Sequence, residues 1–216
     1  MTRRFNSVAL DVDSTLTGIE GIDWLAALRG EEIARSVADA TARAMKGESP
    51  LEDVYGMRMQ LVSPTLKDLE LLTEAYRSAI APGASEEIAK WRDSGVRVVL
   101  VSGGLRAAIL PFAADLGFTP DHIYALDAGF DQNGKFAGFD TASPLCSSTG
   151  KKLALEQLGL PRPILAVGDG MTDVAMKDVA DSFAAFTGFA TRDAVLKHAD
   201  FVVTSFADLT GIVLGE

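Results

Sequence analysis

Two short apolar runs in the chain end in aspartate. The first is Val8-Ala9-Leu10-Asp11-Val12-Asp13-Ser14-Thr15, and the second is Ile164-Leu165-Ala166-Val167-Gly168-Asp169-Gly170-Met171-Thr172-Asp173. Continuous aliphatic runs are typical of parallel strands buried on both faces, and ligands of such sheets collect beyond the carboxyl ends of the strands. We therefore expect both acidic clusters in one crevice. Because gathered carboxylates repel one another, and because oxygen ligands favour a hard cation, the pattern indicates Mg²⁺ and phosphoryl chemistry.

Composition limits the classes of protein that fit. The chain has 216 residues, of which 48% are hydrophobic, enough for one core with a modest insertion. Its net charge of −10 argues against a nucleic-acid surface and against docking on anionic lipid. A single cysteine excludes an internal disulfide and fits a reducing compartment. With neither a signal peptide nor an apolar run of about 18 residues, we expect a cytoplasmic monomer or homodimer.

From about residue 82 onward the sequence alternates between strand-like and helix-like stretches. We expect strands at 96–101, 164–167, 183–186 and 201–204, and helices at 85–92, 105–116, 151–158, 172–179 and 193–198. Between them, Asn133-Gly134 lies between short apolar arms and predicts a β-hairpin over 129–139. The repeated units predict an α/β fold with a doubly wound parallel sheet.

Residues 19–81 have a different pattern, in which apolar residues recur at spacings of three and four. We expect helices at 22–28, 32–45, 51–62 and 66–79, with no strand between them. Helices without intervening strands do not continue a sheet. We therefore interpret 19–81 as a helical cap inserted into a catalytic core formed by residues 1–18 and 82–216.

Asp11 and Asp13 are candidates for the groups that react. Phosphoryl transfer needs an oxygen nucleophile and a second group that protonates the leaving oxygen and then deprotonates water. Their side chains converge only if the strand turns just after Asp11, which the following Ser14-Thr15 permits. A calcium loop is excluded, because an EF-hand needs Gly and Glu where this chain has Leu16 and Ile22. A solvated turn is the remaining alternative.

Three further segments offer contacts to phosphate or metal. Ser102 and Gly103 follow a strand and precede a helix, so we expect them to hold phosphate oxygens at a helix N-terminus, although a tight turn alone also needs small residues. Lys151 opens a helix against the macrodipole, which indicates a compensating anion, the alternative being a surface lysine. We expect Asp169 to bind the metal and Asp173 to orient the lysine.

As an ordered set, these segments resemble the four motifs of the haloacid dehalogenase superfamily, and the resemblance spans nearly the whole chain. It implies that Asp11 attacks phosphorus to form an aspartyl-phosphate while Asp13 acts first as acid and then as base. It implies that Mg²⁺ is held by the carboxylate of Asp11, the backbone carbonyl of Asp13 and Asp169. It implies that Ser102, the N–H of Gly103 and Lys151 hold the phosphoryl oxygens. Asp173 would not contact the substrate but would orient Lys151.

Within that superfamily the chain resembles the phosphoserine phosphatase family. There, a cap glutamate takes the substrate amino group and a cap arginine takes the carboxylate, and Glu20 and Arg58 stand at the matching positions. Thr172 stands where relatives carry asparagine or threonine near the phosphate. The alternative for each charged residue taken singly is a solvated helix position, but the pair in register favours amino-acid recognition.

The function expected from these residues is Mg²⁺-dependent hydrolysis of a small phosphomonoester, above all phosphoserine. A second hypothesis keeps the chemistry and changes the substrate to phosphoethanolamine or a sugar phosphate. A third is a non-catalytic phospho-aspartate switch resembling a receiver domain. Asp13 and the cap argue against the third, because a switch needs neither an acid for a leaving group nor a lid.

Overall fold

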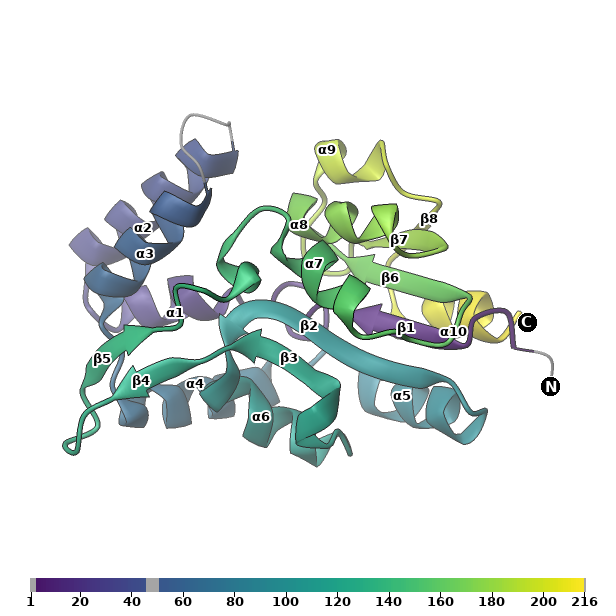
Figure 1. Cartoon of the computed structure of the whole chain (residues 1–216), viewed down its shortest axis with the longest axis horizontal. Coiled ribbons are helices and arrows are strands. Elements are labelled where there is room, and N and C mark those ends of the chain that lie inside the picture. The colour runs from purple at the N-terminus through teal and green to yellow at the C-terminus, as the bar shows by residue number, and fades with distance from the viewer. Residues whose placement is uncertain (1–2, 46–50, 216) are drawn as a thin grey trace.

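The central strand of the fold is β1 (Ser7–Leu10), which pairs in parallel with a strand on each side. The computed structural model describes residues 3–45 and 51–215. Its six-stranded sheet has the order β3-β2-β1-β6-β7-β8, and every pair is parallel (Figure 1). The other strands are β2 (Arg97–Leu105), β3 (Ile123–Leu126), β6 (Ile164–Gly168), β7 (Ser182–Phe186) and β8 (Phe201–Val203). The predicted doubly wound α/β fold is confirmed.

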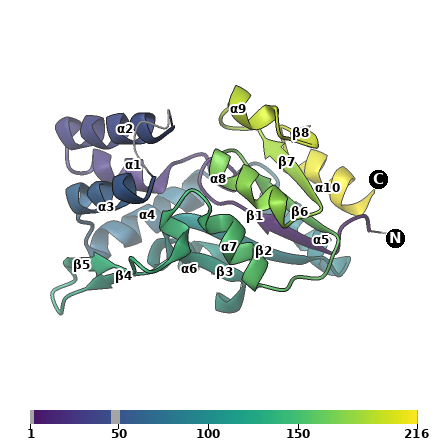
Figure 2. The same cartoon turned by 45° about the horizontal axis from the view of Figure 1, so that its top comes forward.

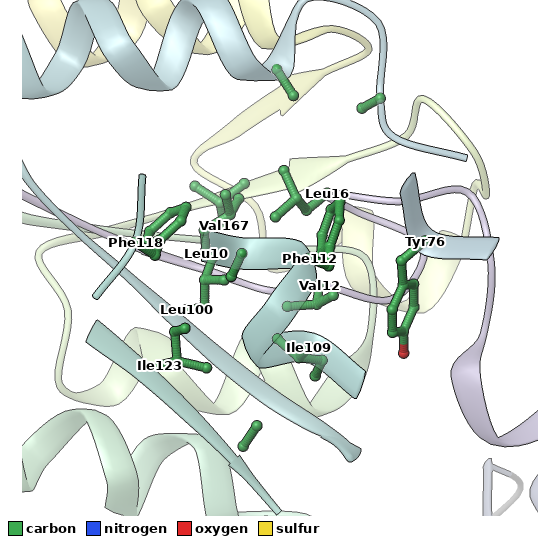
Figure 3. Packing of buried hydrophobic residues seen from close by; sticks show 14 of the residues in the cluster. Leu10, Val12, Leu16, Tyr76, Leu100, Ile109, Phe112, Phe118, Ile123 and Val167 are labelled. Carbon is green, nitrogen blue, oxygen red and sulfur yellow. The ribbon is translucent and has the colours of Figure 1, made fainter. Parts of the chain in front are cut away.

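Helices cover both faces of this sheet because alternate strand residues point to opposite sides. Val8 and Leu10 belong to one apolar cluster, and Ala9 belongs to the other. The larger cluster includes residues of α5 (Ala84–Asp93), α6 (Arg106–Asp115) and α10 (Phe206–Leu214). The smaller includes residues of α7 (Gly150–Gln157) and α9 (Asp193–Leu196). Figure 3 shows part of the larger cluster around Leu10 and Leu100.

The helical segment after β1 consists of α1 (Gly21–Ala27), α2 (Glu31–Met45), α3 (Leu51–Val62) and α4 (Leu66–Ser78). Both views place α1, α2 and α3 together beyond one end of the sheet, with α4 between them and α6 (Figures 1 and 2). The hydroxyl of Thr73 on α4 donates to the carbonyl of Ala108 on α6 at 3.0 Å. The rings of Tyr76 and Phe112 lie 5.6 Å apart between the same two helices. Thus α4 joins the helical segment to the sheet-bearing part.

The predicted hairpin is present as β4 (Ala128–Phe130) and β5 (Phe136–Phe139), which pair antiparallel. Gly134 in its turn has φ +73°, a conformation that suits glycine. The carbonyl of Gly134 accepts a hydrogen bond from the N–H of Leu66 at the start of α4, at 2.9 Å. The hairpin therefore contacts the helical segment and limits where it can lie.

One predicted helix differs from the structure. The helix expected at 172–179 is divided into a single α-turn, α8 (Met171–Val174), and a 3₁₀ turn, η3 (Ala175–Asp178). Short 3₁₀ turns are a common continuation of helix ends. Among the described residues, no helix is long and apolar enough to cross a membrane.

Candidate active site

The chain reverses direction just beyond β1. The N–H of Asp11 still donates to the carbonyl of Val167 on β6, at 3.0 Å. The turn expected immediately after Asp11 comes later, at Ser14, whose φ is +52°. The N–H groups of Leu16 and Thr17 then fold back onto the carbonyl of Val12, at 2.9 and 3.0 Å. This loop sits at the carboxyl edge of the sheet, where the other motifs end.

Lys151 reaches the loop from the first turn of α7, which begins at Gly150. A Cβ at Gly150 would lie 1.8 Å from the carbonyl oxygen of Pro144, so only glycine lets the helix start so close to that segment. The buried Nζ of Lys151 lies 2.6 Å from Oδ1 of Asp11 and 2.6 Å from Oδ1 of Asp173. The positive charge that opposed the helix dipole is thus compensated by two carboxylates.

Asp169 and Asp173 follow β6, and Asp173 is the one that contacts Lys151. Asp173 lies in α8, and its Oδ2 accepts a hydrogen bond from the N–H of Gly170 at 2.9 Å. A Cβ at Gly168 would lie 2.1 Å from Cγ of Asp173, so glycine at the strand end lets this carboxylate close over it. Carboxylate oxygens of Asp11, Asp169 and Asp173 all lie within 4.8 Å of one another, and the three residues are buried.

Burial and mutual repulsion change the protonation of this cluster. Loss of solvent, followed by the charge of Asp173, raises the pKa of Asp11 well above its ordinary value. The same two causes raise the pKa of Asp169 to about 7. Burial alone lowers the pKa of Lys151, but the charges of Asp11 and Asp173 outweigh it and raise that pKa above its usual value. Lys151 therefore stays charged.

These residues fit a divalent cation. Oδ2 of Asp169 is buried and accepts no hydrogen bond from the described residues, although the guanidinium of Arg192 lies 2.9 Å away. Both carboxylate oxygens of Asp173, in contrast, already have a donor, namely Lys151 and the N–H of Gly170. A hard cation favours such all-oxygen donors and relieves the repulsion between carboxylates. Asp11 and Asp169 are thus better placed than Asp173 to bind it directly.

Asp13 has different neighbours from Asp11. Its Oδ1 accepts a hydrogen bond from the hydroxyl of Tyr76 at 2.7 Å, and its Oδ2 accepts one from the N–H of Gly21 at 3.0 Å. Burial, and then the nearby charge of Glu20, raise the pKa of Asp13 to about 7, while the two hydrogen bonds oppose the shift. A carboxyl group with such a pKa can give up or take a proton near neutral pH.

The predicted position of Ser102 and Gly103 at a helix N-terminus is wrong, whereas their contact with phosphate stays a prediction. β2 continues through Leu105, so neither residue lies at a helix N-terminus, and α6 begins only at Arg106. Pairing with β3 is irregular between Val101 and Leu105, which lets this segment leave the regular sheet. The hydroxyl of Ser102 is buried and accepts a hydrogen bond from the N–H of Gly104 at 2.9 Å. Its own proton remains available to a ligand.

Glu20 lies between the two acidic clusters. Its Oε1 accepts hydrogen bonds from the hydroxyl of Ser14 at 2.8 Å and from the guanidinium of Arg192 at 3.2 Å. Its charge also contributes to the raised pKa values of Asp13 and Asp169. Arg192 therefore joins Glu20, at the start of the helical segment, to Asp169 at the end of β6.

Arg58 is buried on α3 and donates from Nη2 to Oδ1 of Asp23 on α1, at 3.2 Å. Its buried Nε finds no hydrogen-bond partner among the described residues. Tyr55 lies one turn earlier and so shares a helix face with Arg58. The hydroxyl of Tyr55 donates to the carbonyl of Gly103 at 2.7 Å, which brings this face of α3 to the carboxyl edge of the sheet.

Comparison with known proteins agrees with this arrangement. A family model described as haloacid dehalogenase-like hydrolase matches residues 8–178, from β1 to the end of η3. The chain belongs to the haloacid dehalogenase-like hydrolase family. Among curated relatives, the chloroplastic phosphoserine phosphatase of Arabidopsis thaliana is 36% identical, covering 96% of this chain and 71% of the relative. The phosphoserine phosphatase of Homo sapiens is 34% identical, covering 95% and 92%.

Solved structures share the fold as well. A phospho-aspartyl intermediate analogue of phosphoserine phosphatase superposes with a TM-score of 0.79 at 25% identity, covering 96% of this chain and 98% of that one. A phosphoserine phosphohydrolase-like protein from Francisella tularensis reaches a TM-score of 0.84 at 24% identity, covering 99% and 100%. The latter shows a common fold only.

Within this haloacid dehalogenase-like site, sequence reasoning missed Tyr76 and Arg192. The helical spacing predicts Tyr76 as an apolar face residue; its ring is indeed buried, but its hydroxyl contacts Asp13. Arg192 follows β7, whose carboxyl end adjoins that of β6, so the rule that ligand sites lie beyond strand ends could have found it.

Thr172 lies half-buried in α8 beside Asp173. Lys152, which follows Lys151, instead forms an ion pair with Asp178 at 2.6 Å on the surface.

Proposed function

We propose that this chain is a Mg²⁺-dependent phosphatase that hydrolyses phosphoserine to serine and phosphate through an aspartyl-phosphate on Asp11. The observation that carries the proposal is the buried contact of 2.6 Å between Lys151 and Asp11, beside an oxygen of Asp169 that accepts no hydrogen bond from the described residues. A lysine and a cation site on either side of one carboxylate suit a reaction in which negative charge accumulates on phosphoryl oxygens.

Asp11 is the proposed nucleophile. Lys151 neutralises its carboxylate and, as the phosphoryl group arrives, also faces the phosphoryl oxygens. The hydroxyl of Ser102 and the N–H of Gly103 are proposed to donate to the same oxygens. Asp173 holds the lysine in place through its own contact of 2.6 Å and is itself held by the N–H of Gly170. Thr172 is proposed as a further phosphate contact from α8.

Asp13 is the proposed general acid and base. Its pKa of about 7 allows it to protonate the leaving serine oxygen and then to accept a proton from the water that attacks the aspartyl-phosphate. Each of its two oxygens accepts one hydrogen bond and keeps a lone pair that can carry the transferred proton.

The proposed metal ligands are the carboxylates of Asp11 and Asp169 and the backbone carbonyl of Asp13. Mg²⁺ bound there would supply positive charge that, together with Lys151, stabilises the phosphoryl oxygens. Burial and the charge of Asp173 raise the pKa values of Asp11 and Asp169, and a bound cation would favour the ionised form of both carboxyls.

Substrate selection is proposed to rest on the helical segment 19–81, acting as a cap over the core formed by 1–18 and 82–216. Glu20 would take the amino group of phosphoserine, and Arg58 would take its carboxylate. The support for Arg58 is its buried Nε without a partner on the helix face that contacts Gly103, because a carboxylate would satisfy that donor. The relatives that align over nearly the whole chain are named for this substrate.

The experiment that tests this proposal measures phosphate release from a panel of phosphomonoesters, with Mg²⁺ and with a chelator. The panel contains phosphoserine, phosphoethanolamine, a sugar phosphate and p-nitrophenyl phosphate. We expect the highest kcat/KM for phosphoserine and no turnover after chelation. A preference for phosphoethanolamine would remove the role of Arg58 and leave the chemistry intact. A stable phospho-protein without turnover would overturn the enzymatic proposal.

A further inference from the structure

Tyr76 contributes a hydroxyl group to the active site from outside the sequence motifs. It lies on α4, its side chain is fully buried, and its hydroxyl donates to Oδ1 of Asp13 at 2.7 Å. In Figure 3 it lies at the edge of the apolar cluster, near Val12. Its polar end therefore meets a reacting group, while its ring packs like a core residue.

Two glycines leave room for this hydroxyl. A Cβ at Gly21 would lie 2.2 Å from the phenol oxygen of Tyr76, closer than any side chain allows. A Cβ at Gly104 would lie 3.5 Å from the same oxygen and 3.1 Å from Oγ of Ser102. Gly21 begins α1, and Gly104 follows the residues proposed to hold phosphate. The phenol oxygen thus lies between the helical segment and the part of β2 that contains Ser102 and Gly103.

The contacts of α4 hold the ring in one place. Thr73 is bonded to the carbonyl of Ala108, and Arg77 pairs with Asp115 at 2.6 Å, so α4 is fastened to α6 on both sides of Tyr76. The ring itself packs against Phe112 of α6, with centroids 5.6 Å apart. The hydroxyl is therefore fixed relative to the sheet-bearing part of the protein.

We propose that Tyr76 is a positioning residue that holds the carboxyl group of Asp13 in the orientation from which it protonates the leaving oxygen. This inference rests on the proposed function. In that step, the bond from phosphorus to the alcohol oxygen breaks as the bond from Asp11 to phosphorus forms, and the alcohol oxygen takes the proton of Asp13. With Gly21 bonded to Oδ2 and Tyr76 to Oδ1, the plane of the carboxyl group is defined by two donors. Without the phenol, one donor remains and the group can rotate.

The test is Tyr76→Phe, which keeps the ring and removes the hydroxyl, with Tyr124→Phe as the matched control. Tyr124 of β3 is half-buried and also donates one hydrogen bond, to the carbonyl of Asp121 at 2.8 Å in an exposed position. For each variant, kcat/KM is measured with an alkyl phosphate, phosphoserine, and with p-nitrophenyl phosphate, whose leaving group departs without a proton. This constant reports the steps up to release of the alcohol or phenol.

We expect Tyr76→Phe to lower kcat/KM for phosphoserine about tenfold or more and to change that for p-nitrophenyl phosphate less than about twofold, because only the alkyl leaving group needs the acid. Tyr124→Phe should leave both constants unchanged. Equal losses on the two substrates would mean that Tyr76 has a merely structural role, and no loss would mean that Asp13 is held without it. Either result overturns the inference while leaving the phosphatase proposal standing.

A second measurement depends neither on turnover nor on the Tyr76→Phe variant. A buried hydroxyl bonded to a carboxylate exchanges slowly with water, so the wild-type protein should show a downfield hydroxyl proton resonance by NMR. Asp13→Asn, which replaces the charged acceptor by a neutral one, should move that resonance upfield. Absence of the resonance, or no response to Asp13→Asn, would contradict the contact. Failure of wild-type protein to hydrolyse any phosphomonoester would instead overturn the proposed function, and this inference with it.

Discussion

Arg58 donates to Asp23 at 3.2 Å, and both residues belong to the helical segment rather than to the sheet-bearing part. The guanidinium is nearly enclosed, with 10% of its side chain exposed, while Asp23 is 37% exposed. Asp23 accepts from Nη2, whereas Nε has no hydrogen-bond partner among the described residues. The arginine is thus oriented by a protein carboxylate, and its buried Nε–H remains available to another acceptor.

Arg58→Ala is expected to weaken the binding of phosphoserine and to spare substrates without a carboxylate. Loss of a charge-assisted hydrogen bond costs roughly 1.5–3 kcal/mol, so KM for phosphoserine should rise about 10- to 100-fold. KM for p-nitrophenyl phosphate should change little. The control is Arg35→Ala, which removes an exposed arginine of the same segment, paired with Glu31. An equal rise in KM for the two substrates would argue against recognition of the carboxylate.

Asp173→Asn is expected to lower kcat, because Lys151 loses one of the two charges that hold it. We expect a loss of about 10- to 100-fold in kcat with a smaller change in KM, because a displaced Lys151 would stabilise the transition state less well. Asp178→Asn is the matched control, since Asp178 pairs with Lys152 of the same helix at the same 2.6 Å, but on the surface. If both variants lost activity equally, the role of Asp173 would be one of general stability.

Addition of Mg²⁺ is expected to stabilise the protein more at about pH 7.5 than at about pH 5.5. The folded-state pKa of Asp169 is about 7, and that of Asp11 is raised, whereas in the unfolded chain both carboxyls ionise near pH 4. Without metal, the contribution of these two carboxyls to folding stability therefore falls as pH rises from about 4 to 7, because they lose their protons first in the unfolded state. A cation reverses this effect because it binds the deprotonated carboxylates.

The measurement is thermal unfolding with and without Mg²⁺ at these two pH values, in salt of matched ionic strength. A gain of about 1–3 kcal/mol near pH 7.5 corresponds to several degrees in Tm for a chain of this size. Asp169→Asn should abolish most of it. A shift that is equal at both pH values, or greater at the lower one, would show that the cation does not compete with protons at this cluster.

The fold could be predicted from the sequence because its signals are local and consistent. Aliphatic runs such as Ile164–Gly168 are typical of buried strands, and Asn133-Gly134 favours a hairpin turn. The end of β2 was predicted less well. Ser102, Gly103 and Gly104 resemble the start of a helix, but the irregular pairing with β3 keeps them extended up to Leu105. Such pairing depends on a distant strand, which the local sequence does not describe.

The candidate site was predictable where its residues lie at the ends of strands. Asp11, Asp169 and Asp173 could be placed together from their positions after apolar runs, and in the structure their carboxylate oxygens lie within 4.8 Å of one another. Lys151 contacts two of them, Asp11 and Asp173. Tyr76 could not be identified in this way. A tyrosine at a helical spacing is typical of a core face, and only the packing of α4 on α6 brings its hydroxyl to Asp13.

The most direct test of the central claim is identification of the residue that carries phosphate during turnover. The protein is mixed with phosphoserine and Mg²⁺, quenched rapidly in acid, digested, and analysed by mass spectrometry for the mass of one phosphoryl group. We expect Asp11 to carry this group and Asp11→Asn to abolish both the phosphoryl adduct and phosphate release. A phosphoryl group on another residue, or turnover that survives Asp11→Asn, would contradict this claim.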